Sequence, residues 1–272
     1  MDILTPQIVF LILLFGTVAG FLAGLLGIGG GVVLVPLFLW LFPLAGFLPE
    51  LVVHTAFGTS LAIILPTAVS STLGHRKRRN VDWSMVLFLA LGGVFGAFFG
   101  SSLAAVMSGQ ILKICFGLML IVISSRLFFY KQPYLPPECY DCARPWPLVF
   151  VGFTGGAFSA FFGIGGGIIT VPLLLIFVHL PMRLAVGNSS ALIVVSSLAA
   201  VVGYIWHGLQ QPVSVPFSVG YVNFLVVFLV APLTMACARL GVKFAGKTSQ
   251  TRLIRIFAIV LAIIGLKIVL GL

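Results

Sequence analysis

Charged side chains are scarce in this chain of 272 residues. Only 7% of its residues are Asp, Glu, Lys or Arg, whereas 61% are hydrophobic. A soluble domain of this length needs far more polar surface, so the composition excludes one and indicates a polytopic membrane protein. We therefore expect an all-α protein whose apolar segments cross a lipid bilayer.

Acidic residues are missing from the interior of the apolar segments. All five lie in predicted loops, at segment ends or near the N-terminus: Asp2, Glu50, Asp82, Glu138 and Asp141. A cation pump usually carries a carboxylate inside the membrane, so this absence argues against one. An anionic substrate fits the chain better.

Signatures of metal binding and catalysis are also sparse. Cys115 and Cys237 lie in apolar segments, where we expect packing roles, and the four cysteines do not form a secreted disulfide framework. Cys139 and Cys142 form one CxxC motif beside prolines, which is a weak signal for zinc without a second ligand pair. We find no His-Glu-x-x-His motif, no paired aspartates and no Ser–His pairing, so an intramembrane enzyme is disfavoured. We expect no metal, no cofactor and no catalytic residue.

The chain carries two copies of one glycine-rich motif. Gly-Ile-Gly-Gly-Gly-x4-Pro begins at Gly27 and again at Gly163, without a gap, at an offset of 136 residues. A second match relates 56–60 to 185–189 at an offset of 129. Internal repetition defines the architecture. We expect a first repeat over 1–130, a linker containing prolines and cysteines over 131–146, and a second repeat over 147–272.

Eight apolar segments are visible, at about 6–42, 51–73, 84–106, 110–130, 147–181, 184–206, 216–240 and 252–271. Six have the length of roughly 20 residues that one membrane-crossing helix needs. The first and fifth are too long for a single crossing, and each has glycines near its middle, where a helix should break. Each long segment is therefore either a broken single span or a helical hairpin.

The distribution of basic residues favours the hairpin. With hairpins, 13 of the 15 Lys and Arg residues fall on one side, and only Lys113 and Lys267 fall opposite. With single crossings, the basic stretches 76–79 and 239–255 would lie on opposite faces, against the positive-inside rule. We therefore attribute the net charge of +10 to basic loops on the cytoplasmic side of the membrane rather than to a nucleic-acid partner. The hairpins predict a cytoplasmic linker, extracytoplasmic termini and two repeats that are inverted in the membrane, each a broken hairpin followed by three transmembrane helices.

The glycine motifs are the main candidate site. Glycines expose backbone N–H groups, and a helix that restarts after them directs its positive end at whatever it faces. Two inverted copies would direct two such ends at one central oxyanion. The alternative is close helix packing through small residues, which we assign to the GxxxG run that begins at Gly16. The predicted backbone ligands are Gly29, Gly30, Gly31, Gly165, Gly166 and Gly167.

Small polar side chains deep in apolar segments are the second candidate group. They would donate hydrogen bonds to the anion, or alternatively bond the carbonyls of their own helices. They are Thr59, Ser60, Asn188, Ser189 and Ser190. His54 and His75 are candidates for proton coupling, with an interfacial structural role as the alternative.

These motifs together resemble the sulfite exporter TauE/SafE family, also called the toluene sulfonate uptake permeases. The resemblance rests on both glycine motifs, on His-Thr-Ala-Phe-Gly-Thr-Ser-Leu at 54–61, on the Gly74–His75 pair and on the two-repeat layout. It implies a bacterial or archaeal plasma-membrane transporter of sulfite, sulfoacetate or a related organosulfonate. The two half-sites differ, because Tyr204 stands where the first repeat has His75.

The sequence thus predicts a secondary transporter, an exporter in our interpretation, that works by alternating access around a midplane site between the two hairpin tips. Its partners would be a small anion and the lipid bilayer, and a homodimer is left open. An uncoupled anion channel and a non-transporting membrane scaffold are the other interpretations.

Overall fold

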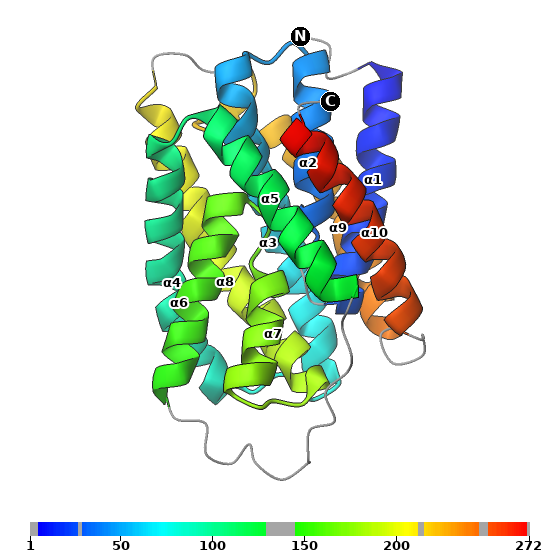
Figure 1. The fold of residues 1–272 in the computed structure, drawn as a ribbon, viewed down its shortest axis with the longest axis vertical. Helices are drawn as coiled ribbons and strands as arrows, with labels where there is room; N and C mark the ends of the chain where they lie inside the picture. The colour runs from blue at the N-terminus through cyan, green and yellow to red at the C-terminus, as the bar shows by residue number, and fades with distance from the viewer. Residues whose placement is uncertain (1–4, 27–28, 129–144, 212–214, 245–249, 271–272) are drawn as a thin grey trace.

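The structure is a computed structural model that describes residues 5–26, 29–128, 145–211, 215–244 and 250–270 (Figure 1). The helices of the first half are α1 (Pro6–Leu26), α2 (Gly31–Leu44), α3 (Pro49–Lys77), α4 (Trp83–Val106) and α5 (Gly109–Phe128). Those of the second half are α6 (Pro145–Phe162), α7 (Gly167–Phe177), α8 (Met182–Leu209), α9 (Phe224–Phe244) and α10 (Gln250–Leu270). Two short strands, β1 (Ser218–Val219) and β2 (Val222–Asn223), precede α9. The predicted linker falls mostly outside the described residues, as do Cys139 and Cys142.

Among the described residues, six helices are long and apolar enough to cross a membrane: α1, α3, α4, α6, α8 and α9. The chain is therefore a polytopic all-α membrane protein, as the composition predicts. One predicted boundary is wrong, because the apolar segment that starts at 216 does not begin as a helix. Its first residues form an antiparallel pair in which Val219 faces Val222, with Gly220 at a φ of 57° in the turn. A glycine in this left-handed conformation and Pro216 both disfavour a helix, so α9 begins only at Phe224.

Both long apolar segments fold back on themselves. A Cβ on Gly30 would lie 2.7 Å from the carbonyl oxygen of Ala19, eleven residues earlier in α1. A Cβ on Gly166 would likewise meet the carbonyl oxygen of Gly155, eleven residues earlier in α6. The chain therefore reverses after α1 and after α6, so each segment is a helical hairpin rather than a single crossing.

The helices α3 and α8 form the centre of the molecule. In each, 78% of the most apolar window is buried, against 39–44% in the other four candidate spans. They pack against each other, and the hydroxyl groups of Ser71 and Ser190 lie 3.3 Å apart across their contact. These two helices therefore provide the core that the hairpins surround.

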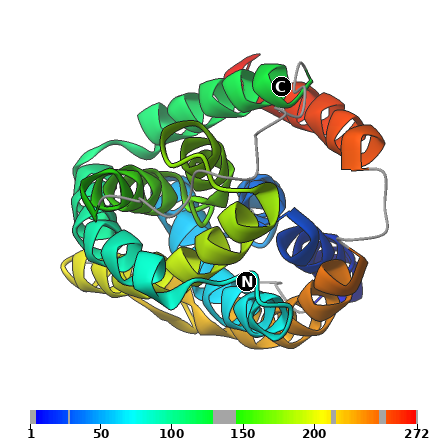
Figure 2. The same cartoon turned by 90° about the horizontal axis from the view of Figure 1, so that it is seen from below.

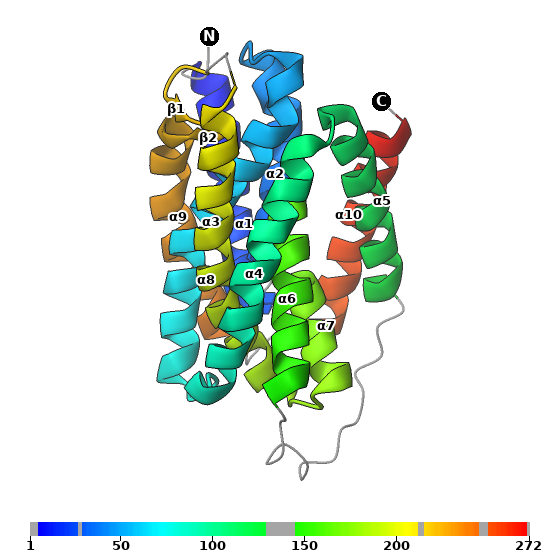
Figure 3. The same cartoon turned by 90° about the vertical axis from the view of Figure 1, so that its left-hand side faces the viewer.

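The remaining helices pack in a pattern that interlocks the two halves. Hairpin helix α1 lies along α9 of the second half, and hairpin helix α6 lies along α4 of the first half (Figure 3). We call α1, α2, α3 and α9 the first unit, and α4, α6, α7 and α8 the second unit. Each unit contains helices from both halves, and the contact between α3 and α8 joins the units.

Small residues allow very close packing within each unit. A Cβ on Gly96 of α4 would collide with the carbonyl oxygen of Phe153 in α6, and one on Gly156 with that of Gly93. A Cβ on Gly24 of α1 would similarly collide with the carbonyl oxygen of Ala238 in α9. The helix backbones therefore touch, as in other small-residue contacts between membrane helices. This agrees with the packing role predicted for the run that begins at Gly16.

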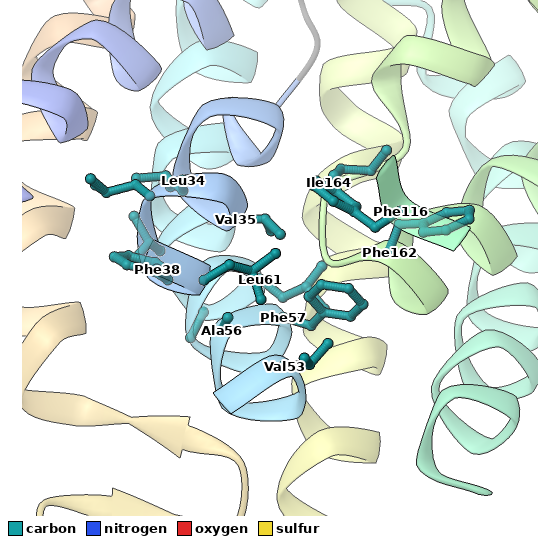
Figure 4. Close-up of a cluster of buried hydrophobic side chains, with 14 of the residues drawn as sticks. Leu34, Val35, Phe38, Val53, Ala56, Phe57, Leu61, Phe116, Phe162 and Ile164 are labelled. Carbon is teal, nitrogen blue, oxygen red and sulfur yellow. The ribbon is translucent and has the colours of Figure 1, made fainter. Parts of the chain in front are cut away.

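The helices α5 and α10 lie side by side on one flank of the molecule (Figure 2). An aromatic contact connects this pair to the core. The ring of Phe116 in α5 packs 5.7 Å from that of Phe57 in α3 and 6.3 Å from that of Phe162 in α6, between centroids (Figure 4).

Basic residues from distant parts of the chain meet at one end. The guanidinium group of Arg78, just after α3, donates a hydrogen bond to the carbonyl oxygen of Lys243 at 3.3 Å. The basic stretch after α3 and the end of α9 therefore lie at the same end of the molecule, as the hairpin interpretation requires.

Candidate functional site

Two glycine turns connect the helices of the hairpins. Gly29 and Gly30 have φ values of 87° and 78°, and Gly165 and Gly166 have 84° and 72°. This left-handed conformation is costly for residues with a Cβ, which explains the repeated glycines. Gly30 and Gly166 are the N-caps of α2 and α7, and no side chain caps either helix. At each turn, the positive N-terminal end of a buried helix therefore has no side chain that caps it.

The two turns contact each other directly. A Cβ on Gly29 would lie 3.4 Å from the Cα of Gly165 and 3.1 Å from the carbonyl oxygen of Ile164. A Cβ on Gly31 would lie 2.6 Å from the Cα of Ile164. The structure thus brings together the two glycine groups that the sequence separates by 136 residues, and leaves no room for larger side chains between them.

The contact lies half-way along the central helices. Ile64, the sixteenth of the 29 residues of α3, would be 3.1 Å from a Cβ on Gly165. Ile193, near the middle of α8, would be 3.4 Å from the same Cβ. Because both central helices are candidate membrane spans, the glycine turns meet at about half the depth of the molecule.

Thr59 and Asn188 hold the starts of two other helices. The Thr59 hydroxyl accepts a hydrogen bond from the backbone N–H of Asn223, which precedes α9, at 3.0 Å. The Asn188 side-chain oxygen accepts one from the backbone N–H of Asp82, which precedes α4, at 2.8 Å. Asn223 and Asp82 in turn cap α9 and α4 with their own side chains. In this conformation the two predicted ligands act as structural anchors across the repeats.

The predicted serines differ in their partners. Ser190 donates to the carbonyl oxygen of Val186 in its own helix, which is the alternative stated for these residues. Ser189 is fully buried. Ser60 is fully buried too, and its hydroxyl has no hydrogen-bond partner in the described part of the chain. Ser60 therefore keeps a free donor inside the protein.

The two candidate histidines lie near opposite ends of α3, away from the glycine turns. The Nε2 atom of His54 is 3.1 Å from the carbonyl oxygen of Ala104, and its ring stacks on Tyr221 at 5.0 Å. Burial raises the pKa of Tyr221, which lies in the turn between the strands. His75 is buried at the other end with its ring near the carbonyl of Gly24. The two imidazoles are 21 residues apart along the helix, or roughly 30 Å.

His75 and Tyr204 occupy corresponding places. The Tyr204 hydroxyl donates to the carbonyl oxygen of Ala160 at 2.9 Å, and Ala160 corresponds to Gly24 at the offset of 136. Each of these side chains thus lies against the last turn of the first hairpin helix. The two repeats therefore differ in which side chain packs against the end of the first hairpin helix: His75 in the first repeat and Tyr204 in the second.

Ser159 is a further candidate residue that the repeated motifs do not indicate. It lies on α6 beside the second turn, is fully buried, and has no hydrogen-bond partner among the described residues. A search for repeated polar positions overlooks it because the corresponding residue of the first repeat is Ala23. Comparing the repeats for their differences would have found it.

Acidic and sulfur ligands do not cluster in the described ranges. Within them, no group of three or more His, Cys, Asp or Glu residues is close enough to hold a metal ion. The donors around the glycine turns are backbone amides and hydroxyl groups, which suit an anion.

A buried pair of converging helix N-termini inside a bundle of membrane-spanning helices is characteristic of membrane transporters. The model of the sulfite exporter TauE/SafE family matches residues 12–268, so the chain belongs to that family. It is 26% identical to a probable membrane transporter protein of Bacillus subtilis, over 95% of this chain and 96% of the relative. It is 28% identical to one of Haemophilus influenzae, over 96% and 98% of the two chains, and 30% identical to one of Xylella fastidiosa, over 75% and 77%. No solved structure matches the chain. The protein is a membrane transporter.

Proposed function

We propose that the protein is a secondary transporter that exports a small sulfur-containing oxyanion, such as sulfite or an organosulfonate, across the plasma membrane. The observation that carries this proposal is the contact of two uncapped helix N-termini half-way along α3 and α8. The family description names sulfite, which supports the substrate class. Neutral N–H donors at helix ends are a common receptor for such anions.

The backbone of the two glycine turns would bind the anion, with the buried hydroxyl of Ser60 beside it. Thr59, Asn188, Ser189 and Ser190 would join the site only if they exchanged their present partners. In the present conformation the turns close against each other, so the anion would enter when their contact opens. Gly29–Gly31 and Gly165–Gly167 are thus both the gate and the receptor in this proposal.

Alternating access would arise from relative motion of the two units. The packing supports an inverted repeat, because several helix pairs have counterparts: α4 lies on α6 as α9 lies on α1, and α4 on α8 as α9 on α3. The two hairpins lie toward opposite ends of the molecule in Figure 1. Rocking of one such unit against the other around a fixed site is a common transport cycle.

The basic end of the molecule would face the cytoplasm, with both termini on the other side. His75 would then lie near the cytoplasmic surface and His54 near the opposite one. A proton carried between two such imidazoles is the coupling mechanism that we propose for export.

Ligand-dependent thermal stability of the purified protein tests the substrate class. We would compare sulfite, thiosulfate, sulfoacetate, taurine, sulfate and chloride, because a ligand raises the melting temperature only if the folded state binds it. Selective stabilisation by a sulfur anion supports the proposal, and its absence with every sulfur anion contradicts it. Saturable exchange of radiolabelled sulfite in proteoliposomes would separate a transporter from an uncoupled channel, whose flux would not depend on anion on the far side.

A further inference from the structure

Five buried hydroxyl groups in the described part of the chain lack the partner that helical hydroxyls usually find, and two of them, on Ser60 and Ser159, lie beside the second glycine turn. Serine and threonine inside a helix commonly donate to the carbonyl oxygen four residues earlier. Thr67 does so with Ile63 at 2.7 Å, and Ser190 with Val186 at 3.0 Å. Ser60 and Ser159 are both fully buried, yet neither hydroxyl has a hydrogen-bond partner in the described residues. An unsatisfied buried hydroxyl is costly, so its presence suggests a ligand.

Ser159 lies beside the N-cap of α7. A Cβ on Gly166 would be 3.0 Å from the Cβ of Ser159. The helix α7 has 11 residues, and its positive end has no side-chain cap. The partnerless hydroxyl of Ser159 and the uncapped N-terminus of α7 therefore lie at the same turn.

Ser60 borders the same turn from α3. A Cβ on Gly163 would lie 2.7 Å from the Cα of Phe57, and one on Gly165 would lie 3.1 Å from the side chain of Ile64. Ser60 is three residues after Phe57 and four before Ile64, so it shares their helix face. Ser60, whose buried hydroxyl has no partner among the described residues, therefore lies on the face of α3 that contacts the second glycine turn.

We propose that Ser60, Ser159 and the first amides of α7 form the anion seat, and that it binds the sulfonate or sulfite group of a monoanion. This inference rests on the proposed transport of a sulfur oxyanion and specifies where the anion is held. A hydroxyl at this position occurs beside the second turn alone, because Ala23 stands at the corresponding place beside the first turn. The first turn closes over the seat through its contact with Gly165.

The donors of the seat determine the charge that it accepts. No Lys or Arg occurs in residues 1–75 or 145–182, which contain both hairpins and nearly all of α3. The cost of burying an ion grows steeply with its charge, and hydroxyls and amides offset less of it than a buried cation would. Methanesulfonate and hydrogensulfite therefore fit the seat, whereas sulfate, with two charges, does not.

Calorimetric titration of the purified full chain with methanesulfonate and with sulfate, at matched ionic strength, tests this seat. We expect Ser159→Ala and Ser60→Ala each to weaken methanesulfonate binding about tenfold or more, the usual loss for a hydrogen bond to a charged group. Ser101→Ala is the matched control. Ser101 is also buried, but its hydroxyl donates to the carbonyl oxygen of Phe98 in α4, so its removal should leave the affinity unchanged.

The melting temperature without ligand provides a second readout. Ser159→Ala and Ser60→Ala remove hydroxyls that have no partner, so we expect the ligand-free variants to be at least as stable as the parent protein. A large loss of stability would contradict the absence of partners and overturn the seat.

The outcomes separate the seat from the transport proposal. Undiminished methanesulfonate binding by both alanine variants would overturn the seat while leaving transport of a sulfur anion in place. Equal affinity for sulfate and methanesulfonate would overturn its selectivity for monoanions. Absence of binding by the parent protein to methanesulfonate and to sulfite would overturn the proposed function itself.

Discussion

Gly166 and Gly46 have the same left-handed backbone but different surroundings. Their φ values are 72° and 78°. A Cβ on Gly166 would collide with the carbonyl oxygen of Gly155, whereas one on Gly46 would have no atom within 4 Å. The two positions therefore separate the cost of the backbone conformation from that of filling the turn.

We predict that Gly166→Ala abolishes sulfite transport and that Gly46→Ala largely preserves it. Both variants carry the strain of a left-handed alanine, about 1–2 kcal/mol, but only the first displaces the start of α7. Transport in proteoliposomes, normalised to the amount of monodisperse protein, measures the difference. Equal activity of the two variants would refute a role for the second turn in binding.

Thr59 and Asn188 allow a prediction about the stability of the protein rather than about transport. Thr59→Ala leaves the buried N–H of Asn223 without its acceptor, and Asn188→Ala removes the acceptor of the partly buried N–H of Asp82. We expect each variant to lose about 1–3 kcal/mol of stability. Thermal unfolding without ligand is the measurement, and anion affinity measured well below the melting temperature should be unchanged. A selective loss of affinity would instead assign these side chains to the substrate.

At the contact between α4 and α6, glycines of one helix lie directly against the backbone of the other. We predict that Gly96→Leu prevents assembly of the second unit, because the added side chain would occupy the space of the Phe153 carbonyl. Phe95→Leu on the exposed face of the same helix is the control. Size-exclusion chromatography of detergent-solubilised protein should give a folded peak for the control only, and a normal peak for Gly96→Leu would contradict the close packing.

Much of the element order could be predicted from the sequence, because it depends on local physics. Runs of apolar residues determined the spans, and consecutive glycines determined the breaks after α1 and α6. The β1–β2 turn was missed because its residues continue an apolar run. The anchoring by Thr59 could not be foreseen, since its partner Asn223 lies 164 residues away in the chain. Ser159 was missed because only one of the repeats carries a hydroxyl there.

For the whole molecule, alternating access predicts that the contact between α3 and α8 must change during transport. Ser71 and Ser190 face each other across it, with their hydroxyls 3.3 Å apart, so cysteines at both positions should form a disulfide. We expect Ser71→Cys/Ser190→Cys, made in a background without other cysteines, to lose transport on oxidation and regain it on reduction.

A crosslink inside one unit is the control for this experiment. The hydroxyls of Thr67 in α3 and Thr234 in α9 lie 2.7 Å apart within the first unit. Oxidised Thr67→Cys/Thr234→Cys should still transport, because both helices belong to the same unit. Full activity of the oxidised Ser71→Cys/Ser190→Cys protein would refute motion at this contact, and loss of activity in both crosslinked proteins would refute the division into units.

The interlocking of the two halves also affects how the cell can build this protein. Domains usually fold in order from the N-terminus as the ribosome releases them. Here α1 is synthesised well before α9, the helix that its glycines contact, because α2 to α8 lie between them in the chain. The glycine surface of α1 therefore lacks its final packing partner until α9 has been synthesised and inserted into the bilayer. Contacts between segments far apart in the chain form slowly. We therefore expect membrane chaperones and proteases to recognise the newly synthesised hairpin of α1 and α2 before α9 is in place.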